Sequence, residues 1–136
     1  MSANIRTALS GTNVPLMAAG LSGGLGVVLG ALGSHAFLEY MDTNQFKAYN
    51  VANQYHLVHS VAMLVAAAVA PRVAEPAAAH FRRAYALFAV GTILLSGSRY
   101  VYCTVHKPHF LSHLPALGGV MLAGGWVLLA VGGSAI

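Results

Sequence analysis

Charged residues are scarce in this sequence. Asp, Glu, Lys and Arg make up 7% of its 136 residues, and hydrophobic residues make up 57%. A soluble globular domain carries about 25% charged residues, so a composition this poor in charge excludes that class and indicates an integral membrane protein. At roughly 20 residues per membrane crossing plus short loops, the length allows about four spanning helices in a single domain.

Acidic residues and cysteine are rarer still, and their scarcity excludes several kinds of site. The three acidic and seven basic residues are scattered, so they form no basic patch and we expect no nucleic-acid partner. The single cysteine, Cys103, excludes an internal disulfide and lies in an apolar segment, where a buried unreactive thiol is expected. No cysteine or carboxylate cluster completes a ligand set, so we expect no metal and no cofactor.

The sequence contains long runs of residues without any charge. No charged residue occurs over 16–38 or over 48–71, and each run is long enough to cross a bilayer core. We therefore predict an all-α integral membrane protein, a four-helix bundle built from two transmembrane hairpins. The predicted parts are an N-terminal tail at 1–15 and one domain at 16–136, with helices at about 16–38, 51–70, 84–105 and 114–133.

The edges of these runs carry further signals. Asp42 or Thr43 is suited to cap a helical turn, so we predict an interfacial amphipathic stretch that runs into the second helix. Pro71 should end that helix, because proline cannot continue it. The third helix must carry Arg99 inside its span to reach the usual length. Such an arginine extends to the headgroups or meets an anion. Glu39 and Asp42 lie on the same predicted side, and a lipid phosphate or another subunit is the alternative.

Glycines are regularly spaced in the first and last predicted helices. Intervals of three, four and three residues place four of them along one seam of the first helix, and in the last helix they recur every seven residues. Gly20 and Gly24 show the same small-residue pattern four residues apart. Such stripes let helix backbones approach closely in lipid. The predicted packing positions are Gly23, Gly26, Gly30, Gly33, Gly118, Gly125 and Gly132.

A polar group of residues opens the second predicted helix. His56 and His59 are three residues apart and would share one helix face. Unpaired polar side chains are costly in lipid, so these residues should face the bundle interior. We predict an interhelical hydrogen-bond network that ties the bundle together, with Arg99 as a partner contact. The predicted members are His35, Tyr55, His56, His59, Ser96, Ser98 and Arg99.

The distribution of charge predicts an orientation. An even number of spans puts both termini on one side, which would hold Arg6, Arg72, Arg82 and Arg83. Because the positive-inside rule counts basic residues in short loops, that side should be the cytoplasm or the mitochondrial matrix. Six of the seven histidines are then expected at the opposite face: His35, His56, His59, His106, His109 and His113.

Four ordered blocks resemble a known family. They are GALGSHA at 30–36, YHLVHS at 55–60, LSGSRY at 95–100 and LPALGG at 114–119, followed by Gly125-Trp126. Together they are similar to the domain of unknown function numbered four hundred and twenty-three, over nearly the whole chain after residue 15. The resemblance implies a small four-helix membrane protein without an established activity. This chain departs from the family pattern at Arg99, where an apolar residue is usual, and at Leu114, where threonine is usual.

The residues offer no complete catalytic set, because the histidines supply a base without a matching nucleophile and oxyanion donors. We therefore expect a non-enzyme: an accessory, structural subunit of a larger membrane assembly, with the bilayer and other membrane subunits as partners. The acid-free, Arg-bearing start suits an organellar targeting segment, which indicates the mitochondrial inner membrane and its respiratory chain, with both termini on the matrix side. Two alternatives stay open: a small proton or solute carrier, and a haem- or metal-binding protein that uses the histidines.

Overall fold

The computed structural model describes residues 13–105 and 109–136, so most of the predicted N-terminal tail and His106 lie outside the described residues. Four segments of the described chain are helical, long and apolar enough to cross a membrane, which confirms the predicted all-helical membrane fold. The elements are α2 (Val14–Ser34), η1 (Leu38–Tyr40), α3 (Thr43–Val69), η2 (Ala70–Arg72), α4 (Ala77–Thr92), the π-helical turn η3 (Ile93–Gly97), α5 (Ser98–Thr104), η4 (His109–Ser112) and α6 (Leu114–Ser134).

The second span begins at Thr43, well before the predicted start at 51. Asp42 is its N-cap and accepts the backbone N–H groups of Asn44 and Gln45, each at 2.9 Å. The Gln45 side chain in turn accepts the backbone N–H of Asp42, which completes a capping box. Because these donors are satisfied, α3 starts here, and the predicted interfacial stretch is the beginning of one continuous helix.

The first span ends at Ser34, before the predicted end at 38. The backbone N–H of Phe37 bonds back to the carbonyl of Leu32 at 2.8 Å, and the chain then enters the short turn η1. His35 is the C-cap of α2 and is exposed. The helix signal in the sequence was apolar character, which continues past Ser34 although the helix does not.

The third span begins at Ala77, ahead of the predicted start at 84. The Glu75 carboxylate accepts the backbone N–H of Ala79 at 3.1 Å and so satisfies a donor in the first turn of α4. Arg82, two turns along, forms an ion pair with the same carboxylate. The hydrogen bond from Arg82 holds the pKa of Glu75 below its ordinary value. The fourth span, Leu114–Ser134, agrees with the predicted 114–133.

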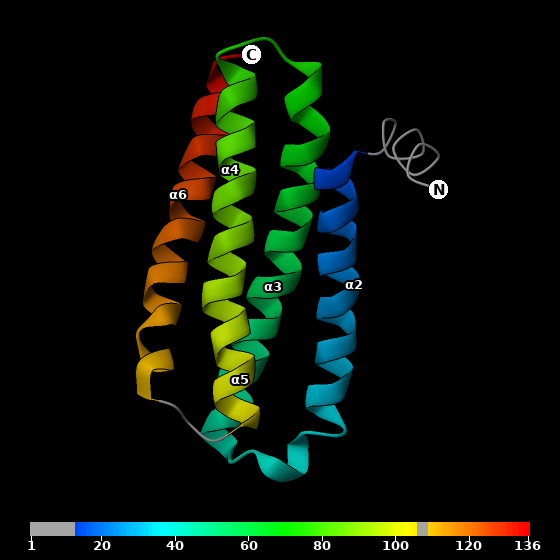
Figure 1. Cartoon of the computed structure of the whole chain (residues 1–136), viewed down its shortest axis with the longest axis vertical. Helices are drawn as coiled ribbons and strands as arrows, with labels where there is room; N and C mark the ends of the chain where they lie inside the picture. Colours follow the sequence, from blue (N-terminus) through cyan, green and yellow to red (C-terminus); the bar gives the residue numbers. More distant parts are fainter. Residues whose placement is uncertain (1–12, 106–108) are drawn as a thin grey trace, which may run out of the picture.

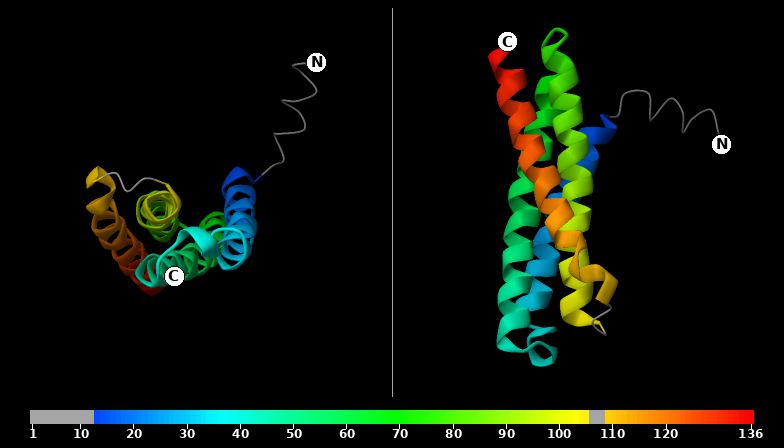
Figure 2. Two further views of the ribbon diagram at one scale, coloured as in Figure 1. Left: turned by 90° about the horizontal axis from the view of Figure 1, so that it is seen from below. Right: turned by 90° about the vertical axis from the view of Figure 1, so that its left-hand side faces the viewer.

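The four spans form an open row. α2 packs on α3, α3 packs on α4, and α4 packs on α6, so that α2 and α6 lie on opposite sides in Figure 2. The start of α2, the α3–α4 connection and the C-terminus lie at one end of the molecule, called here the terminal end (Figure 1). The α2–α3 and α5–α6 connections lie at the other end, called here the loop end.

The buried core is built from small and aromatic residues between α3, α4 and α6. Phe88 and Leu122 lie at its centre with Met63, and Tyr49 lies fully buried in a second cluster towards the loop end. The outer helices expose large apolar side chains, as shown by Leu21 at 68% exposure on α2. These surfaces suit contact with acyl chains rather than with water.

The predicted packing glycines lie at the helix contacts. On α2, a Cβ added to Gly26 would approach Leu57 to 2.8 Å, and one added to Gly30 would approach Asn53 to 2.8 Å. A Cβ added to Gly23 would lie 3.7 Å from the Cβ of Ser60. Two sets of glycines face a neighbouring span. From α2, Gly23, Gly26, Gly30 and Gly33 face α3, and from α6, Gly118, Gly125 and Gly132 face α4 and η3.

The third span carries a π-helical turn that the sequence did not predict. Here α6 comes into backbone contact with its neighbour, because a Cβ on Gly118 would lie 2.5 Å from the Leu95 nitrogen. Ser96 lies within this turn, is fully buried, and donates to the Ala52 carbonyl of α3 at 2.8 Å. Such π-helical turns insert one extra residue into a helix and often occur at functional sites. This one brings α3, the third span and α6 together.

Candidate functional site

A chain of hydrogen-bonded side chains joins three spans at the middle of the molecule. His56 Nε2 lies 3.1 Å from the Ser22 hydroxyl of α2, and His56 Nδ1 lies 3.2 Å from the Tyr100 hydroxyl of α5. Ser22 continues to Ser60 at 2.7 Å, and Asn53 donates to the Tyr100 hydroxyl at 3.1 Å. We call these five residues the His56 chain.

The number of available hydrogens gives the direction of every bond in the His56 chain. The Ser60 hydroxyl donates to the His56 carbonyl at 2.8 Å, so it must accept from Ser22. Ser22 has then used its one hydrogen and must accept from His56 Nε2–H. His56 Nδ1 is left to accept from the Tyr100 hydroxyl. The chain is therefore complete with a neutral His56 that carries its proton on Nε2.

His59 occupies a separate aromatic cluster on the same helix. Its Nδ1 lies 2.7 Å from the Tyr55 carbonyl and must carry the proton, while Trp126 of α6 donates to its Nε2 at 3.1 Å. The His59 ring stacks on Tyr55 and also lies 5.6 Å from the ring of Phe88. His56 and His59 are thus opposite tautomers, and each has both ring nitrogens engaged.

The two histidines lie deeper in the membrane than the sequence predicted. His56 is near the midpoint of the 27-residue α3, about 20 Å from each end. The prediction that His56 and His59 share the loop-end face with His35 is therefore wrong. His35, His109 and His113 do lie at the loop end, whereas the His56 chain lies near mid-membrane.

The other predicted network residues separate into two groups. Ser96 makes an interhelical bond, to the Ala52 carbonyl one turn before His56. Ser98 instead donates to the Leu94 carbonyl of its own helix at 2.5 Å. Tyr55 contributes its carbonyl and its ring to the His59 cluster. The structure therefore brings the central histidines and Ser96 into helix contacts, and it leaves His35 and Ser98 outside them.

Arg99 lies apart from the His56 chain, half-buried near the loop end. Its guanidinium is 5.9 Å from the ring centre of Tyr102. Among residues 13–105 and 109–136 the ion pair is Arg82 with Glu75 at the terminal end, so the predicted pairing of Arg99 with Glu39 or Asp42 is wrong.

Sequence reasoning missed most partners of the two histidines. Ser22 and Tyr100 come from other spans, and Trp126 comes from α6. Ser22 carried a signal, since it is the sole hydroxyl in the apolar run at 14–33, and such a residue needs a partner in lipid. Asn53 carried another, because it lies three residues before His56 on the same face.

A cavity of about 450 Å³ opens beside the His56 chain, between α2, α3 and the third span. We call it the lateral cleft. Its walls are mainly leucine, alanine and isoleucine, and its polar lining includes Ser22, His56, Ser96 and Thr92. Thr92 Oγ1 is buried, with no hydrogen-bond partner among the described residues. An unpaired buried hydroxyl costs roughly 1–3 kcal/mol, so a polar group entering the cleft would be stabilised there.

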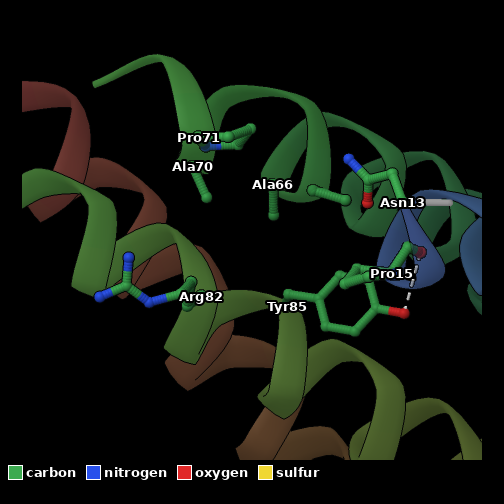
Figure 3. A pocket seen from close by; sticks show the side chains of 8 residues that line it. Asn13, Pro15, Ala66, Ala70, Pro71, Arg82 and Tyr85 are labelled. Atoms are coloured by element: carbon green, nitrogen blue, oxygen red, sulfur yellow. Dashed lines mark hydrogen bonds between the residues drawn. The ribbon is translucent and has the colours of Figure 1, made fainter. Parts of the chain in front are cut away.

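A second cavity, of about 420 Å³, lies towards the terminal end (Figure 3). The start of α2, the end of α3 and the first half of α4 form its walls, with Arg82 at one side. Tyr85 lines both cavities and donates to the Pro15 carbonyl at 3.1 Å. This bond joins α4 to α2 at the residue that the two cavities share.

The sequence matches the family described as "Protein of unknown function (DUF423)" over residues 29–119. The chain belongs to this family. It is 30% identical over 118 residues to the UPF0382 inner membrane protein YgdD of Escherichia coli K12, a match that covers 86% of each chain. It is also 30% identical to the UPF0382 membrane protein C1782.12c of Schizosaccharomyces pombe, over 83% of this chain and 95% of that one. No solved structure matches it.

The arrangement in this DUF423 protein suits helix association better than ligand coordination. In the part of the chain that the structure describes, no group of three His, Cys, Asp or Glu side chains could hold a metal ion. His56 and His59 use both ring nitrogens in hydrogen bonds to other residues, so neither offers a lone pair to a haem iron without losing a helix contact.

Proposed function

We propose that this DUF423 protein is a non-catalytic accessory subunit that packs against another membrane protein through the outer face of α2. The observation that carries the proposal is the environment of Gly20 and Gly24. Both are exposed, and a Cβ added to either would meet nothing within 4 Å. The other glycines of α2 face α3. A small residue repeated after four positions on a lipid-facing surface is the pattern through which transmembrane helices associate.

The internal polar groups support a structural role. Among the described residues, each bond of the His56 chain and of the His59 cluster joins neighbouring side chains or backbone, and the Ser22 and Ser60 hydroxyls beside His56 donate within the network. Interhelical bonds of this kind contribute about 0.6 kcal/mol each on average in a membrane, so the network helps to hold an open row of helices. An open row also leaves α2 with one packed face and one available face.

Charge and one relative support the proposed orientation and an inner-membrane location. Arg72, Arg82 and Arg83 are at the terminal end, against Lys47 and Arg99 towards the loop end, which supports termini on the cytoplasmic or matrix side. The relative in Escherichia coli is named an inner membrane protein. We extend that location to the mitochondrial inner membrane and propose a respiratory-chain complex as the assembly.

Gentle extraction followed by native electrophoresis and mass spectrometry tests the proposal. The wild-type chain should migrate with partner subunits, and Gly20→Leu with Gly24→Leu should release it, because two leucines would keep a partner backbone away. Gly133→Leu is the matched control, since Gly133 on α6 is equally open. Migration of the wild-type protein as a monomer or a simple homo-oligomer would contradict the proposal.

One observation favours a carrier as the second candidate. The sequence predicted His56 at one face of the membrane, whereas the structure places it near mid-membrane beside the lateral cleft. Carriers place ionisable residues at this depth. Proton or solute flux in liposomes that contain the isolated protein, abolished by His56→Gln, would favour this function over the accessory one.

A further inference from the structure

A groove of about 400 Å³ lies towards the loop end, on the side of the bundle formed by α3, the third span and the start of α6. Its apolar lining consists of alanine, valine, leucine and proline side chains. Two cations share it: Lys47 from the second turn of α3, and Arg99 from α5. Tyr55 is also part of its wall. We call this cavity the Lys47–Arg99 groove.

The two cations of the groove are not neutralised by the described part of the protein. Neither lies within 4 Å of a carboxylate there, where the ion pair is Arg82 with Glu75 at the terminal end. Asp42, a carboxylate at the loop end, is engaged as the N-cap of α3. A guanidinium that is half-buried at the edge of a bilayer is strongly favoured to meet an anion.

The depth of the groove suits the boundary between headgroups and acyl chains. Lys47 is four residues from the start of α3, and Arg99 is five residues from the end of α5, so both lie about 6–8 Å inside their helix ends. Val51 and Tyr55 continue the lining along α3 towards the membrane centre. Positive charge therefore lies at headgroup depth and apolar surface lies below it.

We propose that the Lys47–Arg99 groove binds an anionic phospholipid. Its phosphate lies between Lys47 and Arg99, where charge-assisted hydrogen bonds from both cations stabilise it. One acyl chain follows the apolar lining past Val51. The proposal explains why this chain carries an arginine inside a span, and it is independent of the docking face on α2.

Lipid retention by the purified full-length protein tests the site. Native mass spectrometry in detergent with dioleoyl phosphatidylglycerol, dioleoyl phosphatidylcholine or inorganic phosphate should show one retained phosphatidylglycerol in preference to the other two. Lys47→Gln and Arg99→Gln should each weaken that binding about tenfold, the change expected when one charge-assisted bond is lost. Arg99→Lys keeps the charge and should retain most of the preference.

The controls separate a lipid site from general charge attraction. Arg83→Gln removes an exposed cation at the terminal end and should leave lipid retention unchanged. Lys47→Gln changes an exposed position and should fold normally, so it remains informative if Arg99→Gln does not. Equal binding of both lipids by the wild-type protein would overturn the proposal. Displacement of the lipid by an equal concentration of inorganic phosphate would overturn it as well, since the apolar groove would then contribute nothing.

Discussion

The His56 ring of α3 is held by partners from two other spans, and this decides what its loss would do. Its ring receives a hydrogen bond from Tyr100 and gives one to Ser22, and both partners are themselves paired with other residues. Removing the ring would leave a hydroxyl hydrogen and an acceptor without partners near the membrane centre, where water cannot replace it.

We expect His56→Ala to lower the free energy of unfolding by roughly 1–3 kcal/mol, the usual penalty for leaving a buried polar group unpaired. The measurement is unfolding by denaturing detergent, followed by the fluorescence of Trp126, the single tryptophan. His35→Ala changes an exposed histidine and should stay within about 0.5 kcal/mol of the wild type. Equal effects of the two changes would show that the His56 chain contributes nothing to stability.

Single residues also show why the sequence misjudged the depth of the site. The predicted helix at 51–70 put His56 near its start, whereas the capping box of Asp42 and Gln45 begins α3 at Thr43. That difference adds about two helical turns, roughly 12 Å, between His56 and the end of the helix. Asp42 was identified as a cap from sequence. The capped stretch was predicted to run into the second helix, but the span itself was placed at 51–70 instead of starting at this cap.

At the scale of helices, the sequence predicted which helices form more accurately than it predicted how those helices pack together. Apolar runs and Pro71 gave the four spans, and glycine spacing indicated the packed faces of α2 and α6. Which residues of a neighbouring helix meet those faces depends on how far the two helices are shifted along their axes. The residue spacing within one helix does not encode that shift. The π-helical turn at Ile93–Gly97 is of the same kind, because it is stabilised by contact with α6 and α3.

The contact between α6 and this turn supports a prediction on neighbouring glycines. A Cβ on Gly118 would lie 2.5 Å from the Leu95 nitrogen, which is backbone and cannot move aside, whereas a Cβ on Gly119 would lie 3.8 Å from a Leu95 side-chain atom. We expect Gly118→Ala to destabilise the protein by about 1–3 kcal/mol through overpacking. Gly119→Ala should be neutral or stabilising by up to about 1 kcal/mol, because alanine favours helix over glycine.

This comparison is made by measuring the free energy of unfolding of both alanine variants in denaturing detergent. The two changes are chemically identical and adjacent, so helix propensity and hydrophobicity cancel between them. If Gly118→Ala were as stable as Gly119→Ala, the close approach of α6 to the third span would be wrong.

At the scale of the whole molecule, the open row of spans relates the two proposed surfaces. α2, which carries Gly20 and Gly24, lies at one side of the row (Figure 2), and the Lys47–Arg99 groove is lined by α3, the third span and the start of α6. A partner helix and a lipid can therefore bind together without competing. Separate variants of the two surfaces should accordingly change one readout each.

The same architecture predicts a measurable orientation. Four spans place both termini on one side, and that side carries Arg72, Arg82 and Arg83, so it should face the cytoplasm when the protein is produced in a bacterial inner membrane. In a Cys103→Ser background, Glu39→Cys at the loop end should react with a membrane-impermeant maleimide added from outside. Ser134→Cys at the terminal end should react only after the membrane is opened.

The protein that carries only Cys103→Ser is the unlabelled control for this experiment. Cys103 is 3% exposed, and its replacement by serine keeps a hydrogen-bond donor near the Gln45 carbonyl. Reaction of Ser134→Cys alone in intact cells would reverse the orientation, and with it the side on which the anionic lipid of the Lys47–Arg99 groove must lie. Equal reaction of both positions in intact cells would show that they do not lie on opposite sides, which four complete spans require.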